Sequence, residues 1–151
     1  MAIRACAAGV TGWTGAAVTR HILASTDFSL AGAVVRQQSD SDVGEALGLP
    51  HAGIVIKLTV EDAQQEPTDA LIDYTRPDAV KVHTLAALAL AVRVVFGTSG
   101  LTATDSQEID QAARERNLGV IAAGGFSVMA ALAKHFALTA TKYLPSWELL
   151  D

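Results

Sequence analysis

Cysteine and aromatic residues are both scarce in this chain of 151 residues. Cys6 is the one cysteine, and aromatic residues make up 5% of the sequence. A single cysteine excludes an internal disulfide, so nothing indicates an oxidising compartment. The shortage of aromatic side chains, beside abundant alanine, favours a helix-and-sheet domain over a β-sandwich.

Basic charge and long apolar runs are also lacking. The formal net charge is −5 and the pI is about 5.2, which argues against a surface for nucleic acid or acidic lipid. The most apolar window, residues 85–95, contains Arg93 and falls short of the roughly 18 residues of a membrane span. The short apolar run around Arg4 ends at a glycine and does not resemble a signal peptide. We therefore expect a cytoplasmic protein with neither nucleic acid nor a membrane as partner.

What the sequence does contain is typical of one globular domain over residues 1–151. Half of the residues are apolar, 18% are charged and the mean hydropathy is +0.31, so a sizeable core can be buried. Short apolar runs alternate with longer segments of helical periodicity, which is the pattern of βαβ units. The sequence predicts an α/β fold, a doubly wound (Rossmann) parallel sheet with helices on both faces.

The predicted strands are short, and several are apolar on both faces. They cover residues 3–8, 30–35, 54–58, 70–73, 92–96, 119–122 and 147–150. The predicted helices cover residues 14–24, 77–91, 105–116 and 127–143, with a short turn of helix near residues 60–64. Pro77 suits the first turn of its helix, and Thr104 with Gln107 predicts a capping box for the next one.

Two further segments lead to structural expectations. Ser127 is placed to cap the last helix, in which Leu132, Phe136 and Ala140 recur four residues apart. This spacing predicts an amphipathic helix with a buried face. The polar stretch at residues 37–45 is expected to be a mobile surface loop.

The most informative motif is a glycine-rich segment after the first predicted strand. Gly9, Gly12 and Gly15 are spaced three apart in GVTGWTG, between a strand and a helix. Such a turn brings backbone N–H groups and a helix N-terminus to a pyrophosphate. The spacing differs from the commoner G-x-G-x-x-G, and a purely structural strand-to-helix turn is the alternative.

Arg36 follows the second predicted strand, where a Rossmann domain meets the adenosine ribose. An acid at this place binds the 2′-hydroxyl of NAD, whereas a guanidinium pairs with the 2′-phosphate of NADP. Arg36 therefore favours NADPH as cofactor, with NADH possible. The alternative is an exposed arginine at a strand end.

Two more loops follow predicted strands on the same sheet edge, residues 72–77 and 96–101. Carboxyl ends of parallel strands lie on one side, so both loops converge with the glycine turn on one crevice. Thr98 and Ser99 bring hydroxyls and N–H donors that suit a ribose or a carboxamide. Ordinary turn chemistry is the alternative here.

The remaining reactive side chains favour structural roles. Cys6 lies among small apolar residues and reads as a packed core thiol. The four histidines have no metal-ligand spacing, and Ser127 lacks the glycine pattern and the partners of a hydrolase triad. We expect neither a metal site nor a catalytic residue in this chain.

The chain contains four informative segments in this order: GVTGWTG, IDYTRPDAV, VVFGTSGL and AAGGFSVMAAL. Together they resemble the N-terminal domain of the 4-hydroxy-tetrahydrodipicolinate reductase (dihydrodipicolinate reductase) family. The resemblance spans essentially the whole chain. It implies an oxidoreductase that reduces 4-hydroxy-tetrahydrodipicolinate, a small cyclic imine dicarboxylate, with NADPH or NADH in the diaminopimelate route of lysine biosynthesis. It also implies a cytoplasmic homotetramer for the full-length protein.

The resemblance further implies which residues bind the cofactor. Pyrophosphate contact is expected at Gly9, Val10, Thr11, Gly12, Trp13 and Thr14, and adenosine-ribose contact near Arg36. Contact on the nicotinamide side is expected at Thr75, Gly97, Thr98, Ser99, Ala123, Gly124, Gly125 and Phe126.

Three departures from the family pattern matter. Gly125 stands where the family commonly has an asparagine, and Arg36 stands where many members have an acid. The sequence ends at Asp151, where the family's substrate domain would begin, so that domain is expected to be absent. Hydride transfer to a dianionic imine needs cations and a proton donor, and no cluster of Lys, Arg and His is placed to supply them. We therefore expect cofactor binding without turnover from this chain alone.

Two other functions remain open at this point. One is a stand-alone nucleotide-binding or redox-sensing module without enzymatic activity. The other is a different Rossmann dehydrogenase, such as a semialdehyde or amino-acid enzyme, which would share the glycine turn but is not expected to share GTSGL.

Overall fold

The computed structural model describes residues 1–37, 40–64, 66–123, 127–144 and 146. The strands are β1 (Ile3–Ala8), β2 (Phe28–Val34), β3 (Ile56–Lys57), β4 (Ala70–Asp73), β5 (Arg93–Phe96) and β6 (Val120–Ala122). The helices are α1 (Trp13–Ala24), α2 (Val43–Ala46), α3 (Val60–Ala63), α4 (Pro77–Ala89), α5 (Ala103–Arg116) and α6 (Val128–Ala140). The strand predicted at residues 147–150 lies outside the described residues.

The strands form one parallel sheet in the order β3-β2-β1-β4-β5-β6. The chain winds outward from β1 in one direction, returns through α3, and winds outward from β4 in the other direction. The predicted doubly wound parallel sheet is confirmed. The point where the strand order reverses lies between β1 and β4, and ligands of such sheets bind at the carboxyl ends of these strands.

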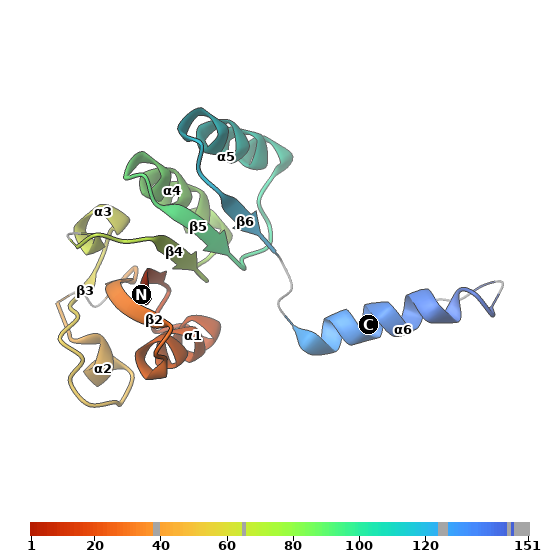
Figure 1. Ribbon diagram of the computed structural model, residues 1–151. Coiled ribbons are helices and arrows are strands. Elements are labelled where there is room, and N and C mark those ends of the chain that lie inside the picture. Colours follow the sequence, from red (N-terminus) through yellow and green to blue (C-terminus); the bar gives the residue numbers. More distant parts are fainter. Residues whose placement is uncertain (38–39, 65, 124–126, 145, 147–151) are drawn as a thin grey trace.

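The sheet separates two apolar cores, because successive side chains of a strand point to opposite faces. Cys6 and Ala8 of β1 pack with α3, α4 and α5, whereas Ala7 packs with residues of the α1 and α2 side. Figure 1 shows α1 and α2 on one side of the sheet and α3, α4 and α5 on the other. Burial raises the pKa of the Cys6 thiol to about 12, so the thiol is neutral at pH 7, as expected for a packed core residue.

The capping box of α5 begins two residues earlier than the sequence predicted. Thr102, not Thr104, is the N-cap: its hydroxyl accepts from the N–H of Asp105, and the Asp105 carboxylate accepts from the N–H of Thr102. Aspartate fills the role predicted for Gln107. The prediction was wrong because threonines two residues apart offer two registers, and the ionised acid in the first turn is the stronger partner.

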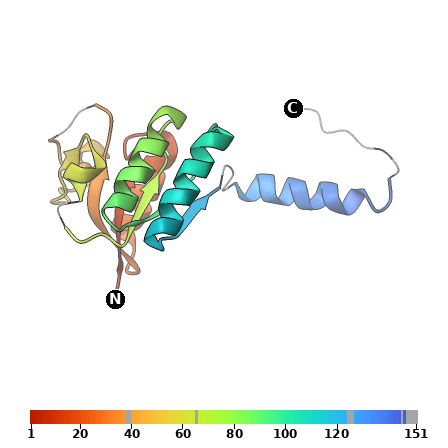
Figure 2. The same cartoon turned by 90° about the horizontal axis from the view of Figure 1, so that it is seen from above.

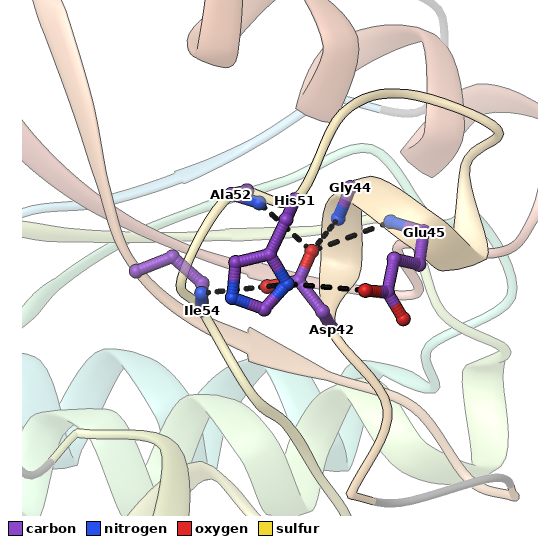
Figure 3. Close-up of polar contacts among 6 residues, drawn as sticks. All are labelled: Asp42, Gly44, Glu45, His51, Ala52 and Ile54. Atoms are coloured by element: carbon purple, nitrogen blue, oxygen red, sulfur yellow. Dashed lines mark hydrogen bonds and ion pairs between the residues drawn. The ribbon is translucent and has the colours of Figure 1, made fainter.

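A clamp built on Asp42 orders the connection between β2 and β3 (Figure 3). Its buried carboxylate accepts four backbone N–H groups, from Gly44, Glu45, Ala52 and Ile54, at 2.8 to 3.3 Å. The hydrogen bonds from Ala52, above all, and from Glu45 and Gly44 lower the pKa of Asp42. Asp42 is the N-cap of α2, which begins within residues 37–45, where the sequence predicted a loop.

The predicted burial of the last helix is wrong. Ser127 caps α6 as expected, through a hydrogen bond from the N–H of Ala130. None of the helix residues is buried, however, and Phe136 is 65% exposed. Figure 2 shows α6 extending away from the sheet. The predicted apolar stripe is therefore present on the helix, but no described element packs on it. No helix within the described residues is long and apolar enough to cross a bilayer.

Candidate functional site

The glycine turn between β1 and α1 is built around one carbonyl oxygen. Gly9 adopts a φ of +81°, and its carbonyl accepts from the N–H of Gly12 at 2.9 Å. A Cβ on Gly15 would lie 2.0 Å from this oxygen, so only glycine lets α1 approach the turn. Gly9 thus makes the tight turn, and Gly15 allows the close contact between the turn and α1.

The first turn of α1 is left without a side-chain cap. Gly12 is the N-cap residue and has no side chain to bond the N–H groups that follow it. These amides and the positive end of the helix dipole are the groups that bind anions at such turns. The turn therefore has the chemistry of a pyrophosphate site.

A cavity of about 330 Å³ opens beside this turn, at the carboxyl edge of β1, β2 and β4. Five of the residues predicted to bind cofactor line it: Gly9, Thr11, Gly12, Arg36 and Thr75. Seven further residues line it: Val35, Leu58, Tyr74, Arg76, Asp78, Ala79 and His83. Tyr74 and Arg76 belong to the loop at residues 72–77, which was expected to face this crevice, whereas the other five were not expected in the site. Asp78 and Ala79 belong to the motif IDYTRPDAV, and His83 lies one turn beyond Ala79 on α4, so helical spacing from that motif could have found it.

Other predicted residues do not line the cavity. Val10 is wholly buried in the core beneath the turn, and Trp13 is almost fully exposed. The remaining ones are Thr14, Gly97, Thr98, Ser99 and Ala123. Gly124, Gly125 and Phe126 lie outside the described residues.

A buried carboxylate joins two of the residues that line the cavity. Asp73, at the end of β4, has no exposed surface, and its Oδ1 accepts from the N–H and the hydroxyl of Thr75 at 2.6 and 2.5 Å. Its Oδ2 lies 2.8 Å from Nδ1 of His83 on α4. A carboxylate accepts only, so Nδ1 is the donor. Asp73 thus fixes the loop after β4 against the helix that follows it.

The loop after β5 is joined to the same network. The hydroxyl of Thr98 donates to the carbonyl of Thr75 at 2.5 Å. A Cβ on Gly97 would lie 2.2 Å from the ring of Tyr74, so the ring packs directly on the glycine backbone. The two loops therefore lie together, as predicted, but only the loop after β4 lines the cavity, and Gly97 and Thr98 do not.

Charges of both signs meet at the mouth of the cavity. Asp78 lies 3.9 Å from Arg36 and 3.5 Å from Arg76, measured between side-chain oxygen and nitrogen atoms. Within the described residues, no group of three or more His, Cys, Asp or Glu side chains is close enough to hold a metal ion. The site thus offers main-chain amides, guanidinium groups and apolar walls, which suit an anionic organic ligand.

Strand order, glycine turn and cavity together define a Rossmann-type domain. A sequence model of the family "Dihydrodipicolinate reductase, N-terminus" matches residues 3–126. The chain belongs to this family, as its motifs suggested.

Relatives and solved structures agree with this assignment. The chain is 34% identical to 4-hydroxy-tetrahydrodipicolinate reductase of Moorella thermoacetica and 35% identical to that of Desulfitobacterium hafniense, over 99% of its own length. It spans 56% and 57% of these relatives. A dipicolinate-bound dihydrodipicolinate reductase from Paenisporosarcina sp. TG-14 superposes with a TM-score of 0.76 at 26% identity, covering 97% of this chain and 56% of that one.

Proposed function

We propose that this chain is the nicotinamide-dinucleotide-binding domain of a reductase acting on 4-hydroxy-tetrahydrodipicolinate. The observation that carries the proposal is the uncapped glycine turn beside a cavity that Arg36 also lines. Family membership supports the reductase activity, and with it a place in diaminopimelate and lysine biosynthesis and a cytoplasmic homotetramer for the whole protein. When bound, the reduced nicotinamide supplies the hydride.

The residues that line the cavity fit the adenosine half of such a cofactor. The amides of the residues that follow Gly12 would bind the pyrophosphate, and Arg36 would pair with a 2′-phosphate, which favours NADPH over NADH. Leu58 and Ala79 supply apolar walls for a planar base. The nicotinamide half would extend toward Thr75, Ser99 and the segment from Ala123 to Phe126.

This chain alone is proposed to bind cofactor without turnover. Hydride transfer to an imine that carries two carboxylates needs cations to hold them. The two arginines at the cavity both face Asp78, and they lie at the adenosine end of the proposed site. An assay of NADPH consumption with 4-hydroxy-tetrahydrodipicolinate tests this; steady loss of absorbance at the nicotinamide band would contradict it.

Cofactor binding is tested by titrating the chain with NADPH and following nicotinamide fluorescence. We expect saturable binding, weakened at least about tenfold by Gly12→Val, whose side chain would occupy the pyrophosphate position. Gly119→Val is the matched control, because a Cβ on Gly119 meets nothing within 4 Å. No saturable change up to millimolar NADPH would overturn the proposed function.

A further inference from the structure

Asp78 stands between two arginines at the rim of the cavity. Its Oδ2 lies 3.9 Å from Nη1 of Arg36, and its Oδ1 lies 3.5 Å from Nε of Arg76. All three residues line the cavity. The guanidinium group proposed for the 2′-phosphate thus already has an internal anion beside it.

The fold explains why these residues meet. Arg36 follows the end of β2, and Arg76 is the N-cap of α4, which begins after β4. Both strands flank β1 in the sheet, so their carboxyl ends open on the same crevice. Asp78 lies in the first turn of α4, where the helix dipole favours a carboxylate. Its position therefore does not depend on the pair with Arg36.

We propose that Asp78 is a specificity-determining residue for the cofactor. It supplies from α4 the ribose-binding acid that the end of β2 lacks, and it competes with a 2′-phosphate for Arg36. A 2′-hydroxyl can donate to this carboxylate, as it does to the acid of NAD-binding Rossmann domains. A 2′-phosphate must instead take Arg36 from Asp78 and accept the repulsion of its charge. The Arg36–Asp78 pair thereby limits the preference for NADPH that Arg36 alone would give.

The size of the effect follows from exposure. The side chains of Asp78 and Arg36 are 60% and 67% exposed, so their attraction is screened by water and either partner is easily displaced. A phosphate dianion within a few ångströms of the same carboxylate is repelled more strongly than a neutral hydroxyl. We expect Asp78 to alter the affinity for NADPH by about fivefold, not by orders of magnitude.

The inference rests on the proposed function, and its test compares dissociation constants of NADPH and NADH for the wild type and Asp78→Asn. Asparagine keeps the shape and removes the charge. NADPH should bind about fivefold more tightly and NADH about twofold more weakly, since the ribose loses its charged acceptor. The pair 2′,5′-ADP and 5′-ADP should show the same divergence, because it isolates the adenosine end of the cofactor.

Asp110→Asn is the matched control. Asp110 is also 60% exposed and also pairs with an arginine, Arg114, at 2.7 Å on α5, away from the cavity. Its substitution should leave both dissociation constants unchanged. In an Arg36→Ala background, Asp78→Asn should tighten NADPH by less than in the wild type, since no guanidinium is released.

The outcomes separate this inference from the proposed function. A wild type that binds neither nucleotide overturns both. Saturable binding of both nucleotides with an unchanged NADPH to NADH ratio in Asp78→Asn overturns only the role of Asp78. A shift of equal size in Asp110→Asn overturns it as well, because the effect would then come from net charge alone.

Discussion

Nδ1 of His83 lies 2.8 Å from Oδ2 of Asp73, a carboxylate with no exposed surface. The same carboxylate accepts two hydrogen bonds from Thr75, whose carbonyl accepts from Thr98. One buried acid therefore connects α4, the loop after β4 and the loop after β5. The loop after β4 and the first turns of α4 line the cavity, and the loop after β5 is hydrogen-bonded to them.

Removal of the Asp73 carboxylate should destabilise the domain strongly. Asp73→Ala leaves the donors of Thr75 and His83 without their acceptor, and each unpaired buried donor costs about 1–3 kcal/mol. We expect urea unfolding to show a loss of about 2–4 kcal/mol. Asp110→Ala, which breaks an exposed ion pair, should change stability by less than about 1 kcal/mol. Equal losses for the two variants would contradict the role of Asp73.

Gly15→Ala should disrupt the glycine turn. The new methyl group would lie 2.0 Å from the carbonyl oxygen of Gly9. This clash can be relieved only if the backbone moves. We expect a lower thermal midpoint and weakened nucleotide binding, because overpacking of this kind costs about 1–3 kcal/mol or more. Gly119→Ala has open space for its methyl group and should show neither effect. A Gly15→Ala variant of wild-type stability would refute the close contact.

The sequence was sufficient to predict the sheet and most of its helices. Strands such as Ile3–Ala8 and Ala70–Asp73 have the predicted bounds, because short apolar runs between turns are unambiguous once helices alternate with them. The strand expected at residues 54–58 is reduced to Ile56–Lys57, since Val55 forms an antiparallel bridge with Asp42. That pairing depends on contacts distant in sequence, which periodicity cannot reveal.

The site was predictable where local backbone chemistry determines it. The glycine turn and Arg36 follow from spacing after a strand. Asp78 and His83 were missed because their roles depend on how α4 packs beside the carboxyl end of the sheet. The exposed apolar face of α6 is a case in which local sequence was not sufficient. An apolar stripe indicates that a helix face is suited to burial, but it does not indicate which element covers that face.

Thr102 and Thr104 provide a direct test of the capping assignment. Thr102→Ala removes the hydroxyl that accepts from the N–H of Asp105 and should cost about 1 kcal/mol in unfolding free energy. Thr104→Ala should change stability by less than about 0.5 kcal/mol. Urea unfolding of both variants measures the difference, and a larger loss for Thr104→Ala would restore the capping box first expected from the sequence.

The clamp on Asp42 should be visible in amide hydrogen exchange. Asp42→Ala removes the acceptor of the N–H groups of Gly44, Ala52 and Ile54, so these amides should exchange faster. Amides of β1 should keep their protection, because the central strands do not depend on the clamp. Asp62→Ala, which removes an exposed acceptor in α3, is the control. Unchanged exchange at Ala52 and Ile54 would contradict the assignment.

Acid should destabilise the domain through two ion pairs. The guanidinium of Arg4 lowers the pKa of Asp69 to about 2, and the ammonium of Lys81 lowers that of Asp105 to about 2, both from 3.8. A carboxylate whose pKa is lower in the folded state than in the unfolded state stabilises the fold at any pH above the unfolded-state pKa. This contribution is lost as pH falls from about 4 to about 2.

Urea unfolding at a series of pH values measures this loss. Asp69→Asn should have a shallower decline between about pH 4 and pH 2 than the wild type, because asparagine does not titrate. At pH 7 the same variant should be less stable than the wild type, since it lacks the charged partner of Arg4. Parallel pH curves for the two proteins would contradict the assignment of Asp69.

The Gly9 carbonyl has a consequence for how this family can vary. One oxygen accepts from Gly12 and leaves no room for a methyl group at Gly15, so the three positions are geometrically interdependent. A chain that lengthened or shortened this bend by a single residue would misplace the oxygen relative to the helix axis. A single change within this bend should therefore disturb all three glycine positions, whereas Arg36, Arg76 and Asp78 contribute through their side chains and can be replaced without moving the backbone of the bend.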